Sequence, residues 1–201
     1  MKFRFISLCL GLLFLGTSQI TAQKIKVESG SIAEIAKEKK VHLLYDYSDF
    51  KVGKDGMTEK EYVDKKVAEY NKEEPGKGDK WQKAWVDSRK TRYEPKFEEL
   101  INEHLKGKGL VHGIYPDAKY TLSVKTIFLE PGYNVGVMKK PSYVSYEFVY
   151  FETADPSKVV FKGKLEEVSG AQAMGFDFDS GTRISESYAK AGKILGKYIA
   201  D

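Results

Sequence analysis

The sequence predicts an α+β fold, a two-layer sandwich in which a long N-terminal helical segment and a C-terminal helix pack on an antiparallel sheet of about four strands. Three observations lead to this prediction. Apolar residues recur at helical spacing over 58–105 and again over 180–200, whereas they alternate with a period of two over 120–168. Each helix and each strand then has one apolar side, and packing the helices on the sheet buries both.

The first 22 residues have the composition of a secretory signal peptide. A cationic start at 1–4 precedes an uncharged apolar run over 6–20, and small residues follow as far as Ala22. A membrane-spanning helix needs about 20 apolar residues, which this run does not reach. We therefore expect removal of 1–22, export across a bacterial inner membrane, and a mature chain without a transmembrane helix in the periplasm or on the extracellular face.

Composition limits the remaining chain to a single core. With 201 residues, of which 41% are hydrophobic, we expect one domain over 41–201 and a loosely ordered lead-in over 23–40. The only cysteine is Cys9, inside the leader, so the mature chain has no thiol for a disulfide, a zinc-thiolate site or a nucleophile. Loss of Lys2 and Arg4 lowers the formal net charge from +4 to +2. Lysine and glutamate are interspersed, which argues against a nucleic-acid partner.

Two helices are predicted in the first half of the domain. Thr58 and Glu61 have the spacing of a capping box, which marks a helix start, and the segment 75–78 is a connector that ends this helix. A longer helical segment then runs over 79–105. Pro95 is expected to kink or divide it, because proline removes one amide and crowds the preceding turn.

Four segments read as strands. Their ranges are 41–47, 120–125, 144–151 and 159–168. The third has apolar residues on both faces over part of its length, so we expect it in the centre of the sheet or covered on its second face. The first is expected to join the same sheet.

The final helix, over 180–200, has the strongest periodic signal. Gly192 and Gly196 lie in its interior, where each costs about 1 kcal/mol relative to alanine. We expect that close packing on the sheet compensates for this cost.

An apolar stretch at 131–141 stands where a hairpin turn is expected to be polar, and the loop at 171–180 is of the same kind. These side chains either fold back over the core or form a contact patch for another molecule. The candidate patch consists of Tyr133, Asn134, Val137, Met138, Met174, Phe176 and Phe178.

Other chemistry-bearing residues have simpler structural interpretations. The three histidines, His42, His104 and His112, lack metal-ligand spacing. Asp177 and Asp179 are weak candidates for Ca²⁺, but the later glutamate of a calcium loop is missing and helix capping is favoured. We expect no cofactor.

Aromatic residues recur along the segment 79–105. Trp81 and Trp85 lie one turn apart and are interpreted as core packing, with a platform for sugar rings as the alternative.

These observations favour a non-enzymatic binding module, for a protein or glycan partner in the cell envelope, that acts through loops 131–141 and 171–180. One alternative is a periplasmic hydrolase with general acid and base roles for scattered carboxylates. Those carboxylates are Asp46, Asp49, Asp177 and Asp179. A second alternative is a structural subunit that forms a homodimer.

Several segments of the sequence resemble those of a known group of proteins. The segments 46–48, 81–97 and 132–136, with the small-residue C-terminal helix, are similar to uncharacterised secreted cell-envelope proteins of Bacteroidetes. The resemblance spans most of the mature chain. It implies an α+β envelope protein and carries no established reaction.

Overall fold

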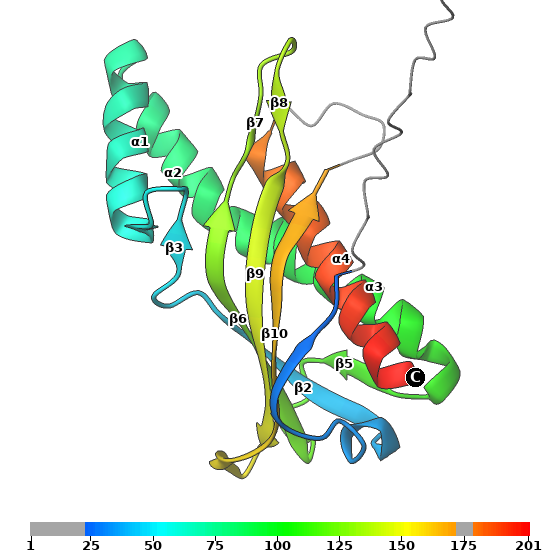
Figure 1. Ribbon diagram of the computed structural model, residues 1–201. Helices are drawn as coiled ribbons and strands as arrows, with labels where there is room; N and C mark the ends of the chain where they lie inside the picture. The colour runs from blue at the N-terminus through cyan, green and yellow to red at the C-terminus, as the bar shows by residue number, and fades with distance from the viewer. Residues whose placement is uncertain (1–22, 172–178) are drawn as a thin grey trace, which may run out of the picture.

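The computed structural model describes residues 23–171 and 179–201 and shows an α+β protein built on a mixed sheet of eight strands (Figure 1). The main strand order is β1-β10-β9-β6-β2-β5, with β3 and β4 attached beside β6. The strands are β1 (Lys26–Gly30), β2 (Lys40–Asp46), β3 (Lys51–Val52), β4 (Met57–Thr58), β5 (Val111–Gly113), β6 (Tyr120–Glu130), β9 (Ser142–Glu152) and β10 (Asp155–Gly170). A separate two-stranded ribbon consists of β7 (Tyr133–Asn134) and β8 (Lys139–Lys140). The signal peptide expected at 1–22 lies outside the described residues.

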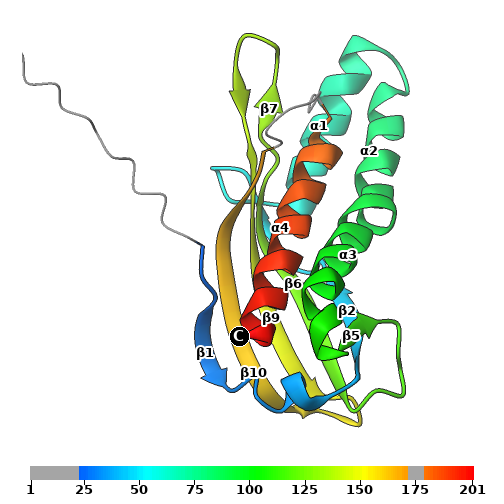
Figure 2. The ribbon, with the colours of Figure 1, turned by 90° about the vertical axis from the view of Figure 1, so that its right-hand side faces the viewer.

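Helices cover one face of this sheet (Figure 2). They are α1 (Glu59–Glu73), α2 (Lys77–Ser88), the π-helical turn η2 (Arg89–Tyr93), α3 (Glu94–Leu105) and α4 (Ser180–Ala200), with short 3-10 turns η1 (Ile35–Lys37) and η3 (Lys106–Lys108). Helix α4 packs on β9, β10 and α3. Within 23–171 and 179–201, no helix has the length and apolar composition to cross a membrane.

The α+β class is confirmed, but the expected antiparallel sheet of about four strands is wrong. Strand β2 runs parallel to both β5 and β6, and β3 is parallel to β6. Parallel neighbours need a long crossover between them, and the helices α1 to α3 supply it between β2 and β5. Alternation along one strand shows which face is buried, but it contains no information on the direction of the neighbouring strand.

The lead-in also differs from expectation, because part of it belongs to the sheet. Strand β1 pairs antiparallel with β10, although all five of its residues are exposed. Backbone hydrogen bonds and ion pairs such as Glu28–Lys164 join it to β10, and neither leaves an apolar signal in the sequence. Strand β9 lies between β6 and β10, as its two apolar faces predicted.

The helix starts follow local sequence chemistry. The backbone N–H of Glu61 donates to Oγ1 of Thr58 at 3.3 Å, and the N–H of Thr58 donates to Oε2 of Glu61 at 2.8 Å, so the predicted capping box is present. Pro95 lies in the first turn of α3, directly after η2. The long helical segment is thus divided near Pro95, where the missing amide of proline costs least.

The glycines of α4 approach a helix and not the sheet. A Cβ on Gly192 would lie 2.3 Å from the carbonyl oxygen of Phe97, and one on Gly196 would lie 2.9 Å from that of Ile101. Both contacts are on α3. The expectation of close packing on the sheet is therefore wrong, because helix spacing identifies a small-residue strip but not the element that faces it.

The two tryptophans pack between α1 and α2. Trp85 is buried, and its Nε1 donates to Oε1 of Glu59 at 2.6 Å. The rings of Trp81 and Tyr62 both lie 5.4 Å from the Trp85 ring. This aromatic cluster joins the two helices into a hairpin, which supports the core-packing interpretation over a sugar platform.

Candidate functional site

The candidate site is the β7–β8 hairpin, which projects beyond the end of the sheet formed by β6, β9 and β10 (Figure 1). Tyr133 pairs with Lys140 and Asn134 with Lys139, so the ribbon continues the direction of β6 and β9. The tip is closed by the backbone N–H of Val135, which donates to the carbonyl oxygen of Met138 at 3.0 Å. The segment 131–141 is therefore a defined hairpin.

Large apolar side chains at the tip are open to solvent. Val137 is 94% exposed, and Val135 and Met138 are 63% and 60% exposed. Tyr133, nearer the sheet, is 45% exposed. These side chains do not fold back over the core. A cluster of this kind on a protruding element is typical of an interaction surface.

Gly132 allows the hairpin to leave the sheet. Its φ is +64°, a value that favours glycine, and a Cβ there would lie 2.3 Å from the carbonyl oxygen of Lys140. Beside it, Nζ of Lys140 pairs with Oε2 of Glu130 at 2.8 Å. The two chains of the hairpin base are thus held in close contact.

A buried arginine on α4 anchors the same base. Arg183 is 3% exposed, and its Nε donates to the carbonyl oxygen of Pro131 at 3.2 Å. Its Nη2 donates to the carbonyl oxygen of Gly132 at 3.2 Å. The sequence pattern did not identify this residue. The signal was a charged side chain at Arg183 in a helical register with Ser187 and Ala191, which are both buried.

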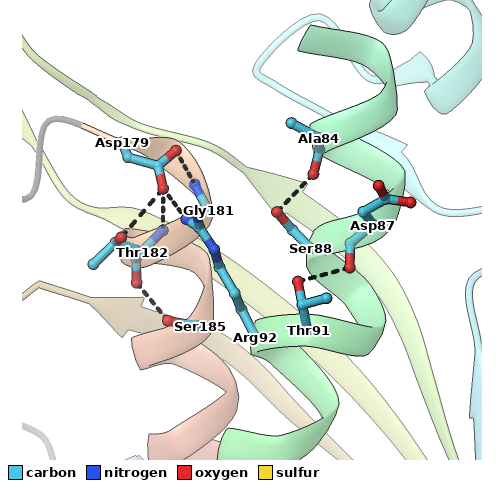
Figure 3. A network of polar contacts seen from close by, with 9 residues as sticks. All are labelled: Ala84, Asp87, Ser88, Thr91, Arg92, Asp179, Gly181, Thr182 and Ser185. Carbon is cyan, nitrogen blue, oxygen red and sulfur yellow. Dashed lines mark hydrogen bonds and ion pairs between the residues drawn. The ribbon is translucent and has the colours of Figure 1, made fainter. Parts of the chain in front are cut away.

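The second predicted loop is described only at its ends. Met174, Phe176, Asp177 and Phe178 lie outside the described residues. Asp179 is the N-cap of α4: its Oδ1 accepts from the N–H of Gly181 at 3.1 Å, and its Oδ2 accepts from the N–H of Thr182 at 3.3 Å (Figure 3).

The carboxylate of Asp179 also pairs with Arg92 of η2. Figure 3 shows that Arg92 and the first N–H groups of α4 approach the same carboxylate. This arrangement ties the start of α4 to η2. It supports the capping interpretation of Asp179 over a calcium ligand, and no group of residues suited to hold a metal ion is found among the described residues.

The carboxylates proposed for hydrolysis have other local roles where they are described. Partial burial acts to raise the pKa of Asp46, but hydrogen bonds from Ser48 and the charge of Lys125 hold it below its usual value. Oδ1 of Asp46 accepts from the N–H of Ser48 at 2.7 Å. Asp49 lies in a turn with φ +56°. The pKa of Asp46 is thus lowered, whereas a general acid requires a raised pKa.

The histidines have structural contacts. Nδ1 of His42 accepts from the N–H of Tyr115 at 3.1 Å, and Nδ1 of His104 contacts the carbonyl oxygen of Leu100 at 2.9 Å. His112 is fully buried, and its Nε2 lies 2.9 Å from the hydroxyl of Tyr150. Burial lowers the pKa of His112 to about 3, so the ring is neutral in the folded protein.

Comparison with known proteins adds little to this geometry. No family model and no curated protein matches the chain. A PelC dodecamer from Paraburkholderia phytofirmans is similar with a TM-score of 0.41 and 15% identity, over 86% of this chain and 96% of that chain. A single-substitution variant of the same dodecamer has a TM-score of 0.38 and 14% identity, over 83% of this chain and 96% of that one. Both TM-scores are below 0.5, so neither likeness establishes a shared fold or function.

Proposed function

We propose that this protein is an exported, non-enzymatic interaction module of a bacterial cell envelope that contacts a protein partner through the tip of the β7–β8 hairpin. The observation that carries the proposal is the 94% exposure of Val137 on a hairpin whose base is fixed by buried Arg183. The cationic and apolar leader of the sequence supports export.

The chemistry of the tip favours a protein over a glycan. Sugar rings are bound by flat aromatic faces, whereas the most exposed side chains here are the aliphatic Val135, Val137 and Met138. Branched and thioether side chains fill pockets on apolar protein surfaces. Tyr133, lower on the ribbon, adds an aromatic side chain at the rim of the contact.

Contacts at the base of the hairpin hold the tip in one conformation before a partner binds. The Glu130–Lys140 ion pair and the two Arg183 hydrogen bonds restrict the ribbon before any partner arrives. A restricted segment loses less conformational entropy on binding than a flexible loop does, so more of the apolar burial contributes to affinity.

The experiment has two stages. A photo-crosslinking amino acid is placed at position 137 in cells that export the protein, and the adduct is identified by mass spectrometry. The partner so identified is then purified and titrated against the wild-type protein and the double variant Val137→Lys/Met138→Lys. We expect the dissociation constant of the variant to rise by about tenfold or more, equivalent to 1.4 kcal/mol.

The matched control is Val159→Lys, which changes an exposed valine on β10 away from the hairpin. It should leave the dissociation constant unchanged, and all variants should keep the wild-type melting temperature. An equal dissociation constant for the tip variant, or no adduct from position 137, contradicts the proposal. An adduct between two copies of this chain supports the homodimer alternative instead.

A further inference from the structure

A groove of about 850 Å³ lies on the side of α4, away from the hairpin tip. Its walls come from α4, from α3 and from the segment before β1. Apolar side chains of Ile25, Ile194 and Tyr198 line it, together with lysines on α4 and Lys24. Its volume is in the range of about 300–1,000 Å³ that small-molecule sites occupy.

The floor of the groove is apolar and is held by the core. Ile25, Ile194 and Tyr198 are partly buried and pack against the core cluster. The ring of Tyr198 lies 5.8 Å from the ring of Phe161 on β10. Ile25 packs so closely on Gly163 that a Cβ there would lie 2.9 Å from its Cγ2. The floor is therefore formed before any ligand binds.

The rim of the groove is cationic. Lys190, Lys193 and Lys197 lie along one face of α4, and Lys24 faces them from the segment before β1. Lys96, also at the groove, pairs with Glu99 at 2.9 Å, whereas the described residues show no ion pair for these four lysines. The acidic side chains at the groove are Glu186 and Asp201. Positive charge is in excess there.

Some lysines elsewhere on the protein pair with carboxylates. On the exposed face of the sheet, Lys162 pairs with Glu147 at 2.9 Å and Lys164 pairs with Glu28 at 2.6 Å. The groove lysines Lys190, Lys193 and Lys197 instead border a groove whose lining includes Ile194 and Tyr198. Partial burial at the groove lowers the pKa of Lys190, against the charge of Glu186.

We propose that this groove binds a single-chain amphiphilic anion, a fatty acid whose carboxylate contacts Lys190 and Lys193 while its alkyl chain lies on Ile194 and Tyr198. The lysines supply charge complementarity to the carboxylate, and the floor removes the alkyl chain from water. The site is distinct from the hairpin and does not depend on its function.

The test is calorimetric titration of the purified protein with laurate below its micellar concentration. We expect saturable binding with one laurate per protein. Lys193→Glu/Lys197→Glu should raise the dissociation constant by about tenfold or more. Lys190→Met, which keeps the aliphatic stem and removes the charge, should also weaken binding, and provides a second measurement if the double variant is unstable.

Three controls separate a specific site from general attraction. Lys54→Glu/Lys72→Glu makes the same change of charge at exposed positions away from the groove and should leave the dissociation constant unchanged. Dodecanol, which has the alkyl chain without the carboxylate, should bind about tenfold more weakly than laurate. Val137→Lys at the hairpin should have no effect on laurate binding.

Three results overturn the proposal. These are the absence of saturable laurate binding, an equal loss in the control pair Lys54→Glu/Lys72→Glu, and dodecanol binding as tight as that of laurate. Vesicles of phosphatidylglycerol distinguish the source of the anion. Binding to vesicles without binding to laurate contradicts the groove and indicates a membrane-surface contact.

Discussion

The Nη2 atom of Arg183 donates to the carbonyl oxygen of Gly132 at 3.2 Å, across 51 residues of sequence. Arg183 belongs to the first turn of α4, whereas Gly132 is the residue at which the chain leaves β6 for the hairpin. The contact is buried at the arginine. The position of the exposed hairpin tip therefore depends on the start of a helix that packs across the sheet.

Replacement of Arg183 by methionine is expected to destabilise the protein and loosen the hairpin. Arg183→Met removes the hydrogen bonds to the carbonyl oxygens of Pro131 and Gly132 and leaves these oxygens without their donors, at a cost of about 3 kcal/mol. Urea unfolding measures the loss, and hydrogen exchange at the amides of Val135 and Gly136 measures the loosening. Arg92→Met, which breaks an exposed pair with Asp179, should cost less than about 1 kcal/mol. If the two variants lose the same free energy of unfolding, the buried Arg183 stabilises the protein no more than the exposed Arg92 does.

The contact between α3 and α4 depends on the absence of a side chain at Gly192. In Gly192→Ala the added Cβ would lie 2.3 Å from the carbonyl oxygen of Phe97, so one helix must move. We expect a loss of about 2 kcal/mol in the free energy of unfolding, despite the better helix propensity of alanine. Gly107→Ala is the control, since nothing lies within 4 Å of its Cβ. An unchanged free energy of unfolding in Gly192→Ala would mean that α3 and α4 can move apart without loss of stability.

His112 is expected to make stability depend on pH. The unfolded chain protonates this ring near pH 6.5, whereas burial lowers its pKa to about 3 in the folded protein. Below pH 6.5 the unfolded state binds more protons, so stability falls with pH until the folded ring also titrates, with a slope of at most about 1.4 kcal/mol per unit.

Urea unfolding between pH 6.5 and 5 measures this slope while most carboxylates remain charged. His112→Gln should remove it, because glutamine does not titrate and retains a donor for Tyr150. The matched control is His104→Gln, which makes the same substitution at a partly exposed histidine in the last turn of α3. If the wild-type protein and His112→Gln have the same slope, the buried ring is not its source.

Local signals in the sequence predicted individual elements well. The capping box at Thr58, the alternation along β6 and β9, and the period of α4 all depend on residues a few positions apart. The apolar hairpin was recognised for the same reason, because four large side chains between two strands have no local cover. Its role as a contact for a partner remains a proposal.

The sequence by itself determined where helices and strands form and which of their faces are apolar, since these follow from side-chain spacing within one segment. Only the tertiary structure decided that β2 runs parallel between β5 and β6, that β1 completes an edge, and that Gly192 faces α3. It also decided that Arg183 reaches Gly132 and that the lysines of α4 border an apolar groove. The physical reason is that these contacts join residues far apart in sequence, and their partners are selected by packing of the whole core.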